Sequence, residues 1–154
     1  MACPQFDSHL GGGRAQRMMI GMGADLCCLK RFEKVIRRAS PLFFKRLLSS
    51  SELACMDAIQ DEQAKTRWVA GVFALKEAAL KACGTGIDGR FAFHSISTVS
   101  SPGGDRQLQL PEALLAELGG ELRCHMALAY SDSMASAFVI IERLPHGSAH
   151  LDIL

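Results

Sequence analysis

The segment VFALKEAALKACGTG, residues 72–86, carries side chains whose spacing could support chemistry on a phosphate. Phe73, Glu77 and Lys81 follow one another at intervals of four residues, so a helix would place them on one face. A carboxylate and an ammonium on successive turns could bind a divalent metal ion and a phosphate group together. A Glu–Lys pair at this spacing is also a common surface feature, which stabilises a helix by about 0.3–0.5 kcal/mol.

The residues around this pair favour a functional role. Large apolar side chains and five alanines between Ala70 and Ala82 make the segment apolar nearly all round; the large ones include Trp68, Val69, Val72, Leu75 and Leu80. Such a helix is expected to be buried, and a buried charge needs a partner or a function. The Gly84-Thr85-Gly86 sequence supplies a natural end for the helix.

A second carboxylate, Asp25, follows the glycine-containing segment MIGMG. Gly21 and Gly23 allow another part of the backbone to approach this strand closely. An acid at a strand end is commonly solvated or caps the next helix. Paired with Glu77, however, it would offer two hard oxygen ligands of the kind that Mg²⁺ prefers.

The order of the helices and strands that must position Asp25, Glu77 and Lys81 predicts an α+β domain. Helices dominate the first half, and a β meander is expected in the second half. The expected elements are a short buried strand at 18–26, helices at 29–38, 41–48, about 50–59 and 61–83, strands at 92–100 and 107–110, a helix at 111–118, and strands at 123–130 and 134–143.

The 154 residues suggest one domain at 18–145, preceded by a flexible leader or tag at 1–17 and followed by a tail at 146–154. The net charge of +1 argues against a general binder of nucleic acid or of membrane surfaces. The six cysteines form no CxxC motif, and no apolar run is long enough to span a bilayer. We therefore expect a cytoplasmic protein with reduced thiols and no membrane partner.

Three segments occur in a characteristic order: GADLCCLKRFEKVI at 23–36, FALKEAALKACGTG at 73–86 and HMALAYSDSMASAFVIIE at 125–142. Together they resemble the holo-(acyl-carrier-protein) synthase type of the 4'-phosphopantetheinyl transferase superfamily, over about Met18 to Arg143. The resemblance implies an antiparallel sheet packed against a long buried helix, in a homotrimer with coenzyme A bound between protomers. It also implies Mg²⁺-dependent transfer of the 4'-phosphopantetheine arm to a serine of an apo acyl carrier protein, as in fatty acid biosynthesis, with release of adenosine 3',5'-bisphosphate.

The resemblance also assigns roles to individual residues. Asp25 and Glu77 would be the metal ligands, and Lys81 would hold a phosphate oxygen or protonate the leaving group. The other coenzyme contacts would come from Lys76, Gly84, Thr85 and His125. His125 would also suit proton transfer, although a histidine satisfied by the backbone is an equal alternative. The acceptor of the serine proton stays open between Glu77, a metal-bound water and a neighbouring group.

The chain departs from the family pattern at three places. Val72 stands where an arginine often contacts the coenzyme, Cys28 occupies a frequently acidic position, and Ala129-Tyr130 replaces a Ser-His pair. These departures put coenzyme affinity and substrate range in question more than the class of reaction. Val72 and Cys28 also keep open a relative that binds the carrier protein without transferring the arm.

Seven basic residues and a single acid, Glu33, lie between Lys30 and Arg46. Carrier proteins are acidic around the modified serine, so a basic helix beginning just after Asp25 would steer them toward the metal. The expected carrier contacts are Lys30, Arg31, Lys34 and Arg38, and Arg31 matches a family arginine. A solvated surface helix and a nucleic-acid-binding module are the alternatives, but one Trp and one Tyr provide few stacking platforms for bases.

Overall fold

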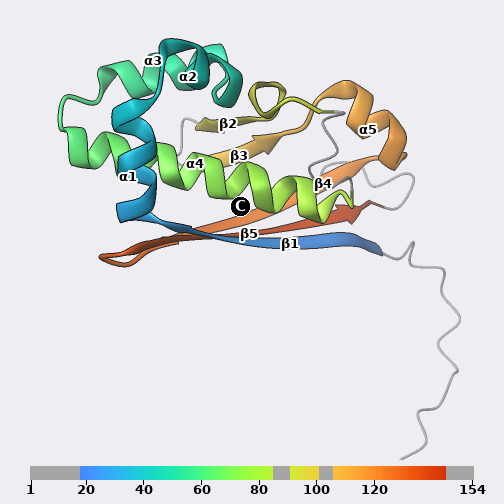
Figure 1. Ribbon diagram of the computed structural model, residues 1–154. Coiled ribbons are helices and arrows are strands. Elements are labelled where there is room, and N and C mark those ends of the chain that lie inside the picture. The colour runs from blue at the N-terminus through green and yellow to red at the C-terminus, as the bar shows by residue number, and fades with distance from the viewer. Residues whose placement is uncertain (1–17, 85–90, 101–105, 145–154) are drawn as a thin grey trace, which may run out of the picture.

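A computed structural model describes residues 18–84, 91–100 and 106–144, so the predicted leader and tail lie outside the described residues. The chain forms the α+β arrangement that the sequence predicts (Figure 1). Its elements are β1 (Met18–Cys28), α1 (Leu29–Arg38), α2 (Pro41–Leu47), α3 (Ser50–Ala58), α4 (Glu62–Ala82), a 3₁₀ turn (Phe93–Ser95), β2 (Ser97–Ser100), β3 (Arg106–Gln109), α5 (Glu112–Leu118), β4 (Leu122–Tyr130) and β5 (Met134–Arg143).

The long helix α4 lies in the middle of the fold. Figure 1 shows it crossing the sheet of β1, β5 and β4 on one side, with α2, α3 and the β2–β3 pair on the other. This placement explains why its sequence is apolar nearly all round. The helix begins where the Asp61 side chain accepts a 2.6 Å hydrogen bond from Ala64 N, and it ends before Gly84, whose φ is +69°.

The main sheet joins the two ends of the described chain. Its strand order is β1-β5-β4, and both neighbouring pairs are antiparallel. The predicted β meander in the second half is therefore only partly right, because β2 and β3 form a separate two-stranded sheet. The expected hairpin of β4 and β5 is confirmed.

The prediction that the first strand is buried is wrong for one of its two faces. Gly23 and Cys27 point toward α4 and are buried, whereas Met22 and Leu26 are 61% and 67% exposed. Successive side chains of a strand point to opposite faces, and α4 covers only one face of this sheet. Phe138 of β5, which is 40% exposed, lies on the same uncovered face.

The segment 92–100 also differs from prediction. Its first part is a 3₁₀ turn rather than a strand, because the Ser95 backbone and side chain both donate to Ala92 O. The helix bounds 29–38 are confirmed, and Pro111 is the N-cap of α5 rather than a residue of its first turn. Within the described residues, no helix is long and apolar enough to cross a membrane.

Candidate active site

Asp25 lies on the face of β1 that packs against α4, opposite Ala137 of β5. The contact between strand and helix is unusually close, because a Cβ built on Gly23 would lie 2.1 Å from Ala78 O. A Cβ built on Gly21 would lie 1.8 Å from Ala82 O. The two glycines thus let the backbone of β1 touch α4, as their positions before Asp25 suggested. The consequence is that Asp25 reaches the side chains of the helix.

Lys81 is the group that Asp25 reaches. Its Nζ lies 2.7 Å from Asp25 Oδ1 and also donates a 3.1 Å hydrogen bond to Ala24 O. The Lys81 side chain is 47% exposed, so its ammonium is accessible from solvent. A cation held beside a carboxylate at a cavity wall is well placed to attract a phosphate.

Glu77, one turn before Lys81, is only 7% exposed. Within the described part of the chain, its carboxylate accepts no hydrogen bond. Burial raises the pKa of Glu77, the negative charge of Asp25 raises it further, and Lys81 opposes both effects. A buried carboxylate next to a second carboxylate is short of positive charge, which a divalent cation would supply.

These groups share one cavity of about 530 Å³. The cavity has an ionic part formed by Asp25, Glu77, Lys81 and Arg31, and a largely apolar wall; the wall residues are Leu26, Phe32, Val35, Phe43, Phe73 and Met134. Asp25 and Glu77, residues far apart in the sequence, therefore line the same cavity. Two carboxylates and a neighbouring ammonium fit a Mg²⁺ ion whose remaining ligands are water and substrate phosphate oxygens.

Two cysteines also line this cavity. Burial, reinforced by the charge of Asp25, raises the pKa of Cys27 to about 11, so its thiol stays protonated near neutral pH. Cys28, at the frequently acidic position of the family pattern, is exposed. No third carboxylate or imidazole joins the pair in the described residues, which hold no cluster of three metal-ligating side chains.

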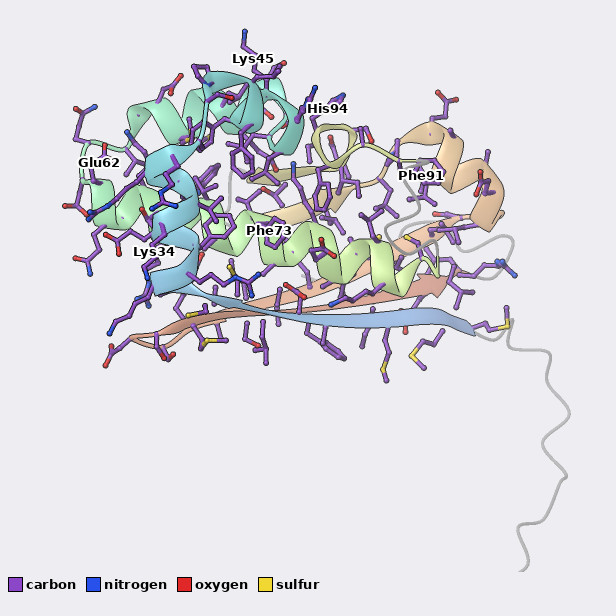
Figure 2. All side chains as sticks on the ribbon, viewed as in Figure 1. Lys34, Lys45, Glu62, Phe73, Phe91 and His94 are labelled. Atoms are coloured by element: carbon purple, nitrogen blue, oxygen red, sulfur yellow. The ribbon has the colours of Figure 1, made fainter. Side chains whose placement is uncertain are left out.

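The basic residues of α1 are exposed and divide between two sides of the helix. Arg31 lines the cavity beside Asp25, whereas Lys30 and Arg37 line a second cavity of about 500 Å³ between α1 and the start of α4. Lys34 projects from the outer side of α1 in Figure 2, and Arg38 lies in its last turn. Among the four predicted carrier contacts, Arg31 is the one that the fold places beside the diacid of Asp25 and Glu77.

Lys76 requires a correction. The sequence predicts that it contacts a coenzyme phosphate, but its side chain is 0% exposed and points away from the cavity into the core. The ammonium donates hydrogen bonds to Leu47 O, Glu52 Oε2 and Phe93 O, which use all three of its N–H groups. It therefore has no donor left for a phosphate in this arrangement.

His125 is not brought to Asp25 and Glu77 within one chain. It pairs with Ile140 of β5 and projects from the uncovered face of the sheet, where its Nε2 lies 2.8 Å from Glu142 Oε2. Gly84 follows directly on the end of α4, and Thr85 lies outside the described residues.

Two of the departures from the family pattern are accommodated by the core. Val72 is 0% exposed within α4, and Tyr130 lies over Gly71, where an added Cβ would come within 2.0 Å of the tyrosine hydroxyl. The guanidinium of Arg67 stacks on the Tyr130 ring at 4.6 Å from its centroid. A tyrosine fits here because residue 71 has no side chain.

Glu52 is not among the predicted site residues, although it is the partner of Lys76. The available signal is the spacing of Ser49 and Glu52, which forms a capping box at the start of α3. That motif explains the hydrogen bonds with Ser49 but does not reveal the longer-range contact with α4.

Comparisons with family models, with curated proteins and with solved structures all find the same family. Residues 21–132 match the 4'-phosphopantetheinyl transferase superfamily (ACPS). The holo-[acyl-carrier-protein] synthase of Desulfovibrio desulfuricans is 36% identical over 129 residues, which cover 82% of this chain and 100% of that protein. The enzyme of the same name from Photorhabdus laumondii is 37% identical over 127 residues, covering 81% and 98%.

Solved structures agree with the sequence relatives. The holo-(acyl-carrier-protein) synthase of Bacillus anthracis in complex with CoA (3',5'-ADP) matches with a TM-score of 0.68 and 30% identity, covering 82% of this chain and 98% of that one. The synthase of Neisseria meningitidis matches with a TM-score of 0.72 and 29% identity, covering 82% and 100%.

Proposed function

The chain belongs to the 4'-phosphopantetheinyl transferase superfamily, among its holo-[acyl-carrier-protein] synthases, and we propose that it transfers the 4'-phosphopantetheine arm of coenzyme A to a serine of an apo acyl carrier protein. The observation that carries this proposal is the meeting of Asp25, Glu77 and Lys81 in one cavity. Their identities match the family pattern, and their combination suits chemistry on a diphosphate.

Asp25 and Glu77 would hold Mg²⁺. When bound, the ion would neutralise charge on the coenzyme diphosphate and so stabilise the transition state of phosphoryl transfer. Asp25, at the end of the close strand–helix contact, and Glu77, in the most buried part of α4, are fixed by the fold. Preorganised carboxylates of this kind cost little to bring together when the substrate arrives.

In the proposed reaction, the serine hydroxyl of the carrier attacks the phosphorus that bears the pantetheine arm. A new P–O bond to serine forms, the P–O bond within the diphosphate breaks, and adenosine 3',5'-bisphosphate leaves with the electron pair. Lys81 stabilises charge on a phosphate oxygen or donates a proton to the leaving group. The serine proton would pass to Glu77 directly, to a metal-bound water or to a neighbouring group.

We propose that the carrier docks on α1. The five basic residues of this helix are exposed and begin two residues after Cys28, close to the cavity mouth. An acidic partner attracted to this helix would approach the diacid along the side where Arg31 lies. Arg31 would thus orient the carrier, while Lys30, Lys34 and Arg38 would mainly accelerate its approach.

We further propose that the active form is a homotrimer. The uncovered face of the main sheet presents Met22, Leu26 and Phe138, all at least 40% exposed, as an apolar surface suited to another copy of the chain. His125 lies on this same face, so an assembly through the face would allow it to serve the cavity of a neighbouring copy. The five described cysteines are free, in keeping with a cytoplasmic location.

The function is tested by incubating the chain with coenzyme A, Mg²⁺ and a purified apo carrier. We expect the carrier to gain the mass of one phosphopantetheine, with loss of the reaction in EDTA and in Glu77→Ala. A panel of carriers from fatty acid, polyketide and peptide synthesis would identify the one that is served. Absence of mass gain with every carrier would contradict the proposal.

A second candidate is a relative that binds the carrier without transferring the arm. The observation in its favour is that Val72, at a position where the family often has a coenzyme-contacting arginine, is fully buried in α4, and that an exposed thiol, Cys28, stands at the frequently acidic position. Carrier binding by calorimetry without mass gain would support this candidate. Salt-dependent binding to duplex DNA instead of carrier would point to a nucleic-acid-binding module.

A further inference from the structure

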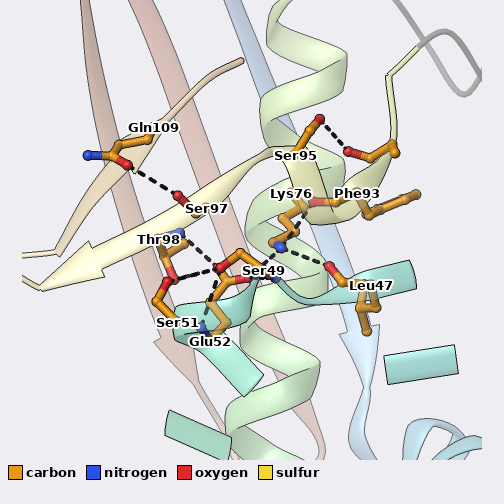
Figure 3. A network of polar contacts seen from close by, with 11 residues as sticks. Leu47, Ser49, Ser51, Glu52, Lys76, Phe93, Ser95, Ser97, Thr98 and Gln109 are labelled. Carbon is orange, nitrogen blue, oxygen red and sulfur yellow. Dashed lines mark hydrogen bonds and ion pairs between the residues drawn. The ribbon is translucent and has the colours of Figure 1, made fainter. Parts of the chain in front are cut away.

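Lys76 and Glu52 form an ion pair in the core (Figure 3), and neither residue lines the cavity of Asp25 and Glu77. Their charged atoms lie 2.5 Å apart, and their side chains are 0% and 1% exposed. Removing two charges from water is costly, and such a pair seldom makes a fold more stable than apolar residues of similar size would. Its presence beside Glu77 in the sequence therefore calls for an explanation other than stability.

The pair ties together five elements of the chain: α2, α3, α4, the 3₁₀ turn and β2. Lys76 on α4 donates to Leu47 O at 2.8 Å and to Phe93 O at 3.0 Å, in addition to Glu52. Three acceptors around one nitrogen match the three N–H groups of a charged ammonium. Glu52 in turn accepts from Ser49 N, Thr98 N and Thr98 Oγ1.

These bonds also explain the direction of the Glu52 pKa. Burial alone would raise it, but the hydrogen bonds from Lys76, Ser49 and Thr98 together lower it, so the carboxylate stays ionised. The network is complete, since both oxygens of Glu52 and every N–H of Lys76 have partners. A complete buried network allows little movement of the segments that it joins.

The two carbonyl groups held by Lys76 belong to segments that support the aromatic wall of the cavity. Leu47 ends α2, and Phe43, one turn earlier on the same helix, lines the cavity. The ring of Phe93 stacks on the ring of Phe73 with centroids 5.8 Å apart, and Phe73 also lines the cavity. Lys76 thus supports Phe43 through the end of α2, and it supports Phe73 through the ring of Phe93.

We propose that Lys76 and Glu52 are positioning residues that hold Phe43 and Phe73 in place and thereby set the affinity of the cavity for its substrate. Neither residue touches the substrate, and the inference rests on the proposed transfer reaction. The wall, rather than the diacid, is expected to depend on the pair, because Lys76 bonds to the carbonyl groups of Leu47 and Phe93, which lie in the segments behind the wall. Substrate affinity should therefore change while the metal requirement stays the same.

The test compares Lys76→Met and Glu52→Gln with the wild type, and Thr98→Val serves as a milder variant that removes one hydroxyl donor. The double variant Glu62→Gln/Lys65→Met is the matched control, since it neutralises an exposed pair on the same helix. All are assayed at a temperature where circular dichroism shows an intact fold. We expect the KM of coenzyme A or of the carrier to rise by about tenfold in the two core variants, with a smaller change in kcat and unchanged Mg²⁺ dependence.

Hydrogen exchange of metal-free, substrate-free protein supplies a readout that does not depend on activity. We expect faster exchange confined to 41–48 and 91–97 in the core variants, and none of these changes in the control. Lowered melting temperature with unchanged KM values, or exchange that accelerates uniformly, would overturn the proposal. If Lys76→Met does not fold, Thr98→Val decides by the same criteria, and if the wild type transfers nothing, exchange alone decides whether the pair positions the wall.

Discussion

Asp25 and Lys81 meet across the contact between β1 and α4, with Asp25 Oδ1 and Lys81 Nζ 2.7 Å apart. Because Lys81 is 47% exposed, this pair contributes little to stability, about 0–1 kcal/mol. Its importance is positional, since it brings an accessible cation to the edge of a cavity that Asp25 and Glu77 line. If a metal ion were bound by the two carboxylates, as we propose, the ammonium would be free to turn to a phosphate.

Glu77→Gln should remove the reaction while leaving the fold intact. The amide keeps the shape of the side chain but loses the charge needed to hold Mg²⁺, so we expect kcat to fall by at least about 100-fold. Transfer rates and urea unfolding measured side by side would show this, with the exposed Glu62→Gln on the same helix as control. A variant with near wild-type turnover would exclude Glu77 as a metal ligand.

The pH dependence of stability should carry the signature of Glu77. Its pKa in the folded state is raised by burial and by Asp25, so its contribution is fully present below the unfolded pKa of about 4.3 and is lost as pH rises through the folded pKa. In EDTA, the free energy of unfolding of the wild type should therefore rise relative to that of Glu77→Gln as the pH is lowered through this window. The rise is at most about 1.4 kcal/mol per pH unit. Urea unfolding between about pH 4 and 8 measures the difference. A difference that stays flat, or that changes in the opposite direction, would contradict the raised pKa.

Arg31→Glu should weaken the binding of the carrier protein and leave the binding of coenzyme A nearly unchanged. Reversing the charge at the cavity mouth opposes an acidic partner, and we expect the KM of the carrier to rise by at least about tenfold. Coenzyme affinity, measured separately by calorimetry, should change by less than about twofold. Lys45→Glu on α2 makes the same change of net charge away from the cavity and should have a smaller effect. Equal losses for both substrates, or in both variants, would argue against docking at Arg31.

Gly23→Ala should damage both stability and metal binding. Its new methyl group would lie 2.1 Å from Ala78 O, so β1 must move away from α4 and carry Asp25 with it. We expect a loss of about 2–4 kcal/mol in the free energy of unfolding, with a weaker Mg²⁺ activation constant in the fraction that folds. Gly119→Ala is the control, since its φ of +68° and ψ of +148° cost about 1–3 kcal/mol but no atom lies within 4 Å of the new carbon, so its Mg²⁺ activation should stay unchanged. Identical behaviour of the two variants would contradict the role of the close contact.

Phe138→Glu should dissociate the proposed homotrimer. The side chain lies in the middle of the uncovered sheet face and is 40% exposed in one copy, so a charge there is tolerated in the monomer but not between copies. Sedimentation should show a trimer for the wild type and for Leu115→Glu, whose exposed site on α5 lies elsewhere, and a monomer for Phe138→Glu. A wild type that sediments as a monomer, or a Phe138→Glu variant that stays trimeric, would rule out this interface.

Local sequence signals predict most elements because their physical causes are local. The bounds of α1 follow from its amphipathic pattern, and the start of α4 follows from the Asp61 cap. The pairing of β1 with β5 is not predicted, since register between distant strands leaves no mark in either sequence alone. The exposed face of β1 escapes prediction for a related reason: methionine and leucine are also the residues of buried strands.

The candidate site is predictable where a motif fixes residue types, and less so where direction matters. Asp25, Glu77 and Lys81 share the cavity as expected. Lys76 and Glu77 are adjacent in the sequence, yet a helix turns successive side chains about 100° apart, so one points to the core and the other to the cavity. The direction of the His125 side chain is not predictable from the sequence. Successive side chains of β4 point to opposite faces of the sheet, and the sequence does not reveal which of these faces α4 covers.

The partnership of β1 with β5 has a consequence for how the protein is made. The strand β1, which carries Asp25, is synthesised before β5, the strand against which it is held. Until β5 has left the ribosome, we expect Asp25 to have no fixed place beside α4, and nascent chains lacking β5 should be unable to assemble the diacid. The site therefore forms only once β5 closes the sheet.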